Sequence, residues 1–180
     1  MSLAVKRYAE ALINTAEEGN CLEEVYEEFT TLYTTLREDP FFPILLERDI
    51  LTVSEKQDLI NSVFGEGNSY FRSFLLLLAE RKHLDEVEDM YLSFRELYRE
   101  KERILAAEVV TAAALTEELR EKLVTALRRK YNVRLVELTE TVDPEILGGM
   151  TIYANNEMLD ASLKTRFEGL REHLKQTEIK

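Results

Sequence analysis

YREKERILAAEVV, residues 98–110, is the stretch in which the hydrophobic period of the chain changes. Before it, apolar residues recur every three or four positions, as in amphipathic helices. After it, this helical period is mixed with short runs of β-branched residues and leucine, which are typical of strands. We therefore divide the chain into residues 1–104 and residues 105–180. The expected fold class is mainly α, with an N-terminal six-helix bundle followed by a small α+β C-terminal domain.

The first three helices of the bundle are predicted from apolar stripes and end signals. One stripe runs from Val5 to Ala16, with Gly19 as the stop signal, and a second runs from Leu22 to Leu36. Asp39 followed by a proline indicates the start of a short third helix, residues 40–46. Because none of these short helices could bury its stripe alone, they are expected to pack together.

Three further helices complete the bundle. Ser54 and Gln57 have the spacing of a capping box, and the fourth helix that they open should end at Gly65. The fifth helix, residues 70–79, is apolar almost all round, so it should lie in the centre of the bundle or face a partner. The sixth begins at Asp85 in an acidic turn, which suits the positive end of a helix.

The second domain begins with two strands and a helix between them. Residues 104–110 and 133–142 predict the strands, and residues 116–131 predict the helix. The last turn of that helix is basic, with Arg128, Arg129 and Lys130. These side chains either complement the negative end of the helix or form a docking patch.

A hairpin and a final helix are predicted to follow. Residues 150–154 and 158–159 flank Asn155 and Asn156, a pair that tolerates left-handed turn geometry. The adjacent glycines at positions 148 and 149 lead into a strand and not into a helix, so they predict a tight turn and not a phosphate loop. Asp160 should cap a helix whose apolar seam consists of Leu163, Phe167, Leu170 and Leu174.

Composition restricts the partners. The net charge of −12 over 180 residues argues against nucleic acid or an anionic lipid surface, and favours basic or amphipathic protein surfaces. The longest apolar run, residues 74–79, is too short to span a bilayer, and the N-terminus lacks the apolar stretch of a signal peptide. Membrane association is therefore expected only through partners. One cysteine, Cys21, cannot form an intramolecular disulfide, which suits a reducing compartment.

The sequence offers no spacing that assembles a catalytic or metal site. His83 and His173 are far apart, and the many carboxylates are expected to form solvated helix faces. Cys21 has no histidine near it in sequence, so a packing role is expected. We expect no catalytic residue, no metal and no cofactor, and the residues alone predict an adaptor. Two classes of function stay open: a free-standing acidic helical adaptor or regulator, and an enzyme with an unrecognised site.

Three segments resemble the delta subunit family of F-type ATP synthases, which includes the mitochondrial oligomycin-sensitivity-conferring protein. KRYAEALINTA, residues 6–16, is similar to the opening helix of that family. FLLLLAERKHL, residues 74–84, resembles its fifth helix and the following turn. The most specific segment is VELTETVDPEILGGMTIYANNEMLDASLKTRFEGLREHL, residues 136–174. Its strand, Asp-Pro turn, glycine pair, hairpin and leucine-seamed helix come in the order of the family's C-terminal signature.

This resemblance implies a non-catalytic stator subunit. The N-terminal domain would bind the N-terminal segment of an alpha subunit on the catalytic head, and the C-terminal domain would bind the b-subunit peripheral stalk. The head would then not turn with the rotor during proton-driven ATP synthesis. The implied location is peripheral, on the cytoplasmic face of the cell membrane, or on the stromal face of the thylakoid in a chloroplast.

Two sets of residues are expected to bind these partners. The first helix presents small residues beside which another helix could approach closely, and the fifth helix has more apolar surface than one side of a small bundle needs. The expected alpha-subunit-binding residues are Ala4, Arg7, Tyr8, Ala11, Ser73, Leu76 and Leu77. The expected stalk-binding residues are Met150, Ile152, Leu159, Leu163 and Phe167. For both sets, burial in the core of the domain is the open alternative.

Overall fold

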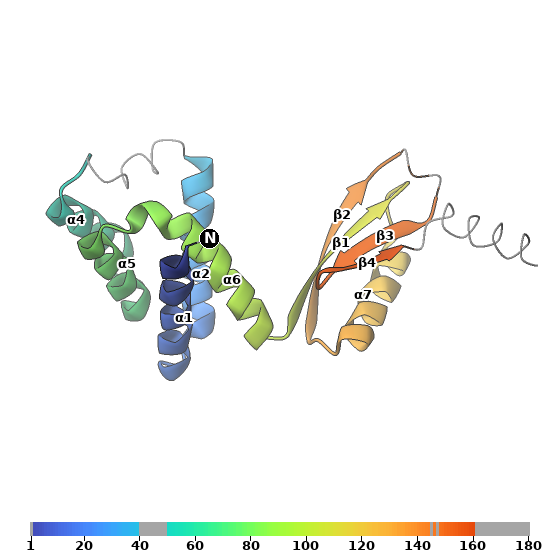
Figure 1. The fold of residues 1–180 in the computed structure, drawn as a ribbon, viewed down its shortest axis with the longest axis horizontal. Helices are drawn as coiled ribbons and strands as arrows, with labels where there is room; N and C mark the ends of the chain where they lie inside the picture. The colour runs from blue at the N-terminus through green and yellow to red at the C-terminus, as the bar shows by residue number, and fades with distance from the viewer. Residues whose placement is uncertain (1, 40–49, 145, 147, 161–180) are drawn as a thin grey trace, which may run out of the picture. The chain divides into compact units, whose positions relative to one another are not determined.

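The computed structural model describes residues 2–39, 50–144, 146 and 148–160 of the chain (Figure 1). Contacts divide the chain into two compact units, Met1–Tyr98 and Arg99–Lys180. The division falls in the last turn of helix α6 (Val87–Lys101), shortly before the first strand, β1 (Ile104–Thr111). The chain is mainly helical, with a small mixed sheet in its C-terminal part.

The first unit is helical throughout its described elements. Its helices before α6 are α1 (Leu3–Glu18), α2 (Leu22–Glu38), α4 (Val53–Phe64), α5 (Ser69–Arg81) and the single 3₁₀ turn η1 (Leu84–Glu86). The predicted third helix, residues 40–46, lies outside the described residues. A six-helix bundle is therefore not confirmed, whereas the other five predicted helices are present.

The core of this unit is built around Phe29 of α2, whose side chain has no exposed surface. Its ring centroid lies 5.1 Å from that of Phe71 and 5.5 Å from that of Phe94. Rings at such tilted angles contribute stability beyond the area that they bury. Of the stripe predicted for α1, Tyr8 is half-buried and the other five residues are in the core: Val5, Ala9, Leu12, Ile13 and Ala16. The helical period thus identified the inward face of α1 correctly.

The start of α4 differs from the prediction by two residues. The capping box consists of Thr52 and Glu55, not of Ser54 and Gln57. The Thr52 hydroxyl accepts the Glu55 N–H, and the Glu55 carboxylate accepts the Thr52 N–H at 2.8 Å. A capping residue needs an extended backbone, which Thr52 has, whereas Ser54 already lies inside the helix.

The end of α1 is in the predicted place but has a different cause. Gly19 keeps a right-handed conformation with φ −79°, and the left-handed residue is Asn20 with φ 53°. Gly19 is required by space, because a Cβ there would lie 2.7 Å from Cε2 of Tyr70. The glycine therefore lets the start of α5 approach the end of α1.

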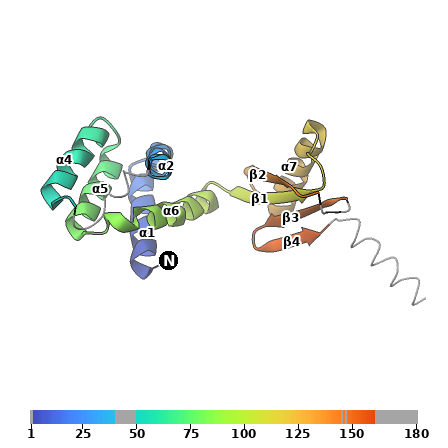
Figure 2. The ribbon, with the colours of Figure 1, turned by 90° about the horizontal axis from the view of Figure 1, so that it is seen from above.

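The second unit is a four-stranded sheet with helix α7 (Glu117–Tyr131) on one face (Figure 2). Its further strands are β2 (Leu135–Val142), β3 (Met150–Ala154) and β4 (Glu157–Asp160), in the order β2-β1-β3-β4. β1 and β2 are parallel, and the other two pairs are antiparallel. A parallel pair needs a crossover connection, and α7 provides it.

The turns of the second unit agree with the sequence prediction. Asn155 and Asn156 join β3 to β4, and both have positive φ, 50° and 59°. Gly148 and Gly149 also have positive φ, 127° and 86°, immediately before β3. The final helix predicted after Asp160 lies outside the described residues.

Alternation along the strands separates two faces of the sheet. Leu105, Ala107 and Val109 of β1 are buried and form a core with Leu127 of α7. Val136, Ile152 and Ala154 complete this core from the neighbouring strands. We call the face that packs against α7 the inner face, and the opposite one the outer face.

Candidate partner-binding surfaces

Helices α1 and α5 lie side by side and run antiparallel. At one end, the ring of Tyr8 lies 5.5 Å from that of His83, which follows α5. At the other end, Tyr70 near the start of α5 packs against Gly19, which follows α1. Because the two helices are in contact near both ends, their exposed flanks adjoin and make one surface. We call it the α1/α5 surface.

The α1 side of this surface combines small, aromatic and basic side chains. Ala4, Tyr8 and Ala11 are spaced four and three residues apart, so they lie along one flank of the helix. Ala4 and Tyr8 are half-buried, and Ala11 is exposed, as is Arg7. The two alanines leave room for the backbone of another helix, and Arg7 places a positive charge at the edge.

The α5 side is identified by the contact between Tyr70 and α1. Leu77 lies seven residues after Tyr70, on the same flank of the helix, and Ser73 lies between them. Ser73 is exposed, and Tyr70 and Leu77 are 43% and 40% exposed. The remaining apolar residues of α5 are mostly core, because Phe71, Phe74, Leu75, Leu78 and Ala79 are buried. Helix α5 therefore lies largely in the core, as one of the two expectations from its sequence had it, and also exposes Tyr70 and Leu77.

Leu76, another expected binding residue, lies on a different flank of α5 from Leu77. Successive helical residues are about 100° apart around the axis, so Leu76 and Leu77 lie on opposite flanks of the exposed side of α5. Leu77 shares its flank with Tyr70, which contacts α1. Leu76 is half-buried and faces away from α1. Tyr70, which the sequence analysis did not name as a binding residue, lies on the flank of Leu77 and packs against Gly19.

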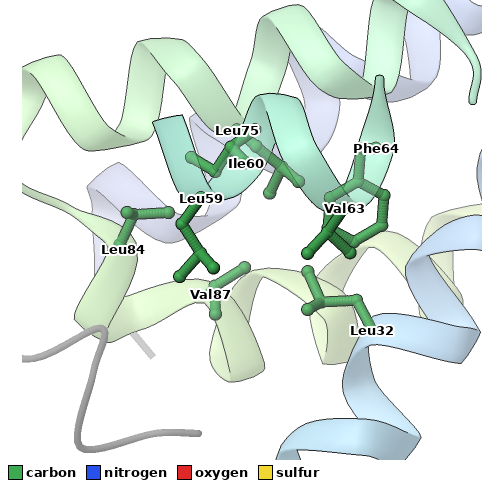
Figure 3. Close-up of a pocket in the computed structure, with 8 residues that line it drawn as sticks. All are labelled: Leu32, Leu59, Ile60, Val63, Phe64, Leu75, Leu84 and Val87. Atoms are coloured by element: carbon green, nitrogen blue, oxygen red, sulfur yellow. The ribbon is translucent and has the colours of Figure 1, made fainter. Parts of the chain in front are cut away.

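An apolar cavity of about 20 Å³ lies between α2, α4, α5 and the segment from η1 to α6 (Figure 3). The side chains that converge on it are all apolar: Leu32, Leu59, Ile60, Val63, Phe64, Leu75, Leu84 and Val87. A space of this size has room for about one water molecule, and this lining offers no polar partner to hold one. The cavity is therefore a gap in core packing and cannot accommodate a nucleotide or cofactor.

Three of the five residues predicted to contact the stalk, Met150, Ile152 and Leu159, lie on the inner face of the sheet. Ile152 is 7% exposed and belongs to the core, and Met150 and Leu159 are half-buried against it. Strand alternation directs all three toward α7, so the open alternative of burial in the core describes Ile152 fully and the other two in part. Leu163 and Phe167 lie outside the described residues.

The outer face of the same hairpin carries the exposed apolar residues. Tyr153 and Met158 are cross-strand neighbours, and 46% and 60% of their surfaces are exposed. Leu135 of β2, on the same face, is 48% exposed. The sequence analysis missed these residues, although alternation with Ile152 and Leu159 in the predicted strands could have indicated them.

The basic turn at the end of α7 holds the hairpin. Lys130 Nζ lies 3.1 Å from Glu157 Oε2, and the Tyr131 hydroxyl donates to the same oxygen at 2.8 Å. The hydrogen bond from Tyr131, followed by that from Lys130, lowers the pKa of Glu157. The hydrogen bond to Glu157 in turn raises the pKa of Lys130. Lys130 thus has a structural role, whereas Arg128 and Arg129 are exposed and either earlier alternative remains for them.

The remaining candidate groups have structural surroundings. Cys21 is buried, with its Sγ 3.6 Å from the carbonyl oxygen of Ala16, as expected for a packing residue. His83 sits at the predicted helix junction, with Nδ1 3.1 Å from Glu86 Oε2. In the part of the chain that the structure describes, there is no cluster of three or more His, Cys, Asp or Glu suited to a metal ion. Nor does any described helix have the length and apolar character needed to cross a membrane.

Comparison with known proteins confirms the family resemblance. A model of the ATP synthase delta (OSCP) subunit family matches residues 4–174. The ATP synthase subunit delta of Moorella thermoacetica is 35% identical over 175 residues, which cover 95% of this chain and 96% of the relative. That of Nostoc punctiforme is 31% identical over 164 residues, covering 91% and 89%.

The fold is also that of a solved structure. A chain in the cryo-EM structure of the Toxoplasma gondii mitochondrial ATP synthase hexamer has a similar fold, with a TM-score of 0.74 at 22% identity. The match covers 97% of this chain and 98% of the other. The chain therefore belongs to the ATP synthase delta (OSCP) subunit family and is a structural, not a catalytic, subunit of that complex.

Proposed function

We propose that this chain is the stator subunit that links the catalytic head of an F-type ATP synthase to its peripheral stalk. The domain of residues 1–104 binds the N-terminal segment of an alpha subunit, and the domain of residues 105–180 binds the b-subunit stalk. The link keeps the head from turning with the rotor, so that proton-driven rotation is coupled to ATP synthesis. Membrane association is indirect, on the cytoplasmic face of the cell membrane or the stromal face of a thylakoid.

The α1/α5 surface is the observation that supports head binding most strongly. Its two flanks expose Ala11 and Leu77 beside the buried core faces of α1 and α5. This combination suits the apolar face of an amphipathic helix, which binds a partner through residues spaced three and four apart. The alanines set the distance of closest approach, and Leu77 and Tyr70 provide the apolar area.

The distribution of charge also fits a protein that holds other subunits together rather than one that catalyses a reaction. The many carboxylates lie on exposed helix faces, whereas the residues that we name on the α1/α5 surface include one charged side chain, Arg7. A neutral, apolar contact keeps most of its strength at physiological salt, because screening acts on charges and not on buried apolar area. Such a contact suits a link that must persist under load.

The test compares Leu77→Asp with Leu76→Asp, the same substitution in adjacent residues on opposite flanks of α5. A charge placed in the contact with a bound helix should cost about 2 kcal/mol or more, which corresponds to a roughly 30-fold loss of affinity. We expect this loss for Leu77→Asp in titrations with a synthetic peptide of the alpha N-terminus, and affinity close to that of the unchanged chain for Leu76→Asp.

Thermal unfolding of each variant serves as the control, because Leu77 is exposed and its replacement should leave the domain folded. A second variant of this surface, Ala11→Asp, probes the α1 side. If Leu77→Asp and Ala11→Asp are both folded and both bind the peptide with unchanged affinity, the α1/α5 surface is not the binding site.

A further inference from the structure

The outer face of the sheet is the uncovered side of the second unit among its described residues. Strand register places Ile104, Ala106 and Val110 of β1 beside Leu135 of β2 and Tyr153 of β3 on this face. Met158 extends the apolar surface onto β4, opposite Tyr153. Leu135, Tyr153 and Met158 are each at least 46% exposed, so large apolar side chains meet water on three of the four strands, β2, β3 and β4.

The charges that the described strand residues place on this face are of one sign. Three carboxylates, Glu108, Glu137 and Asp160, lie on the outer face, and its described strand residues include no lysine or arginine. Arg99, at the end of α6, pairs with Glu137. Glu108 accepts a hydrogen bond from the hydroxyl of Thr141 at 3.2 Å and is exposed. An apolar partner that also carries basic side chains would complement this surface.

The dimensions of the face suit one helix. Four strands about 4.8 Å apart form a surface roughly 14 Å wide, and an α-helix with its side chains is about 10 Å across. Helix α7 already packs on the inner face of the same sheet in this way. A second copy of the chain fits poorly, because two acidic faces would repel and each chain carries a net charge of −12.

We propose that the outer face is the docking surface for the b-subunit stalk, and that it takes an amphipathic helix with an apolar stripe flanked by lysine or arginine. This inference rests on the proposed function and adds the face, the residues and the chemistry of the bound segment. In this proposal the residues of the outer face bind the stalk in place of Met150, Ile152 and Leu159, which pack toward α7.

The first experiment measures oxidation of methionine by hydrogen peroxide, read by mass spectrometry on the full chain. Met158 is 60% exposed, whereas Met90 is fully buried and serves as the internal reference. In the chain alone, Met158 should oxidise at least tenfold faster than Met90. A recombinant fragment of the b-subunit stalk should slow the oxidation of Met158 at least tenfold and leave Met90 unchanged.

The second experiment measures affinity for the same stalk fragment with a matched pair of variants. Tyr153 and Leu119 are both 46% exposed, but Leu119 belongs to α7. Tyr153→Asp should weaken binding at least tenfold, whereas Leu119→Asp should not. Reversing a charge in Glu108→Lys should also weaken binding and reduce its dependence on salt concentration.

Each unfavourable result has its own meaning. Slow oxidation of Met158 in the chain alone would show that residues 161–180 or another part of the chain cover the face, and would overturn the proposal. The stalk fragment could bind without protecting Met158 from oxidation, or Tyr153→Asp and Leu119→Asp could weaken binding equally. Either result would show that the outer face is not the docking surface, but it would leave the stator function standing. If the fragment does not bind the unchanged chain at all, the proposed stalk function fails together with the face.

Discussion

Replacing Phe29 by alanine should remove a large part of the stability of the first unit. The side chain is fully buried, and its ring lies within 6.0 Å of four others, those of Phe71, Phe74, Tyr91 and Phe94. These rings belong to α5 and α6, so Phe29 joins three helices. Alanine in its place would leave a cavity that all three border.

The expected loss can be set from the cost of such cavities. A buried Phe→Ala change costs about 3–5 kcal/mol, and the rigid aromatic neighbours limit collapse into the space, which favours about 4 kcal/mol. Domains of this size are stable by about 5–15 kcal/mol in total, so Phe29→Ala should bring the unit close to unfolding. Phe29→Leu keeps most of the volume and should cost only about 1.5 kcal/mol.

Urea unfolding followed by near-ultraviolet circular dichroism measures this loss. The chain has no tryptophan, and two stacked tyrosine pairs lie in the first unit. The ring centroids of Tyr26 and Tyr98 are 3.9 Å apart, and those of Tyr33 and Tyr91 are 4.3 Å apart. These pairs should therefore dominate the near-ultraviolet circular dichroism signal. A loss below about 1 kcal/mol for Phe29→Ala, at an unchanged slope with urea, would refute the central place given to this ring.

Two further substitutions test local features. Gly19→Ala fits the backbone, which has φ −79°, but its Cβ would lie 2.7 Å from the Tyr70 ring, so thermal unfolding should show a loss of about 1 kcal/mol that Tyr70→Ala relieves. A stabilised Gly19→Ala variant would contradict this contact. Glu157→Gln tests the contact by which Lys130 and Tyr131 hold the hairpin, which we call the clamp. Because the pKa of Glu157 is lowered in the folded state, its stabilisation is present above the ordinary carboxyl pKa of 4.5 and is lost as the pH falls through the lowered value. Stability measured from pH 6 downward should therefore fall more steeply in the unchanged chain than in Glu157→Gln, and parallel curves would count against the clamp.

Local sequence signals predicted the elements whose cause is local. Asn155 and Asn156 fix a tight turn by their own left-handed backbone, and Thr116 caps α7 by accepting the N–H of Leu119. The capping box of α4 was placed wrongly because two pairs of residues with the same spacing overlap there. Only the backbone of Thr52 decides between them.

Which faces are free to bind a partner could not be predicted from the sequence, because this depends on contacts between distant segments. The sequence shows that Leu76 and Leu77 differ in direction, but only the packing of Tyr70 on Gly19 shows which of them faces α1. In the same way, alternation separates Ile152 from Tyr153, but the side of the sheet that α7 covers decides which is buried. Periodicity therefore defined the faces, and tertiary packing decided which face is free.

In the proposed function, one chain holds the head and the stalk at the same time through separate surfaces. Analytical ultracentrifugation of the full chain with a labelled alpha N-terminal peptide and a recombinant b-subunit fragment tests it directly. We expect a ternary complex, from which Leu77→Asp removes only the peptide and Tyr153→Asp removes only the stalk fragment. Competition between the two ligands, or loss of both in either folded variant, would contradict it.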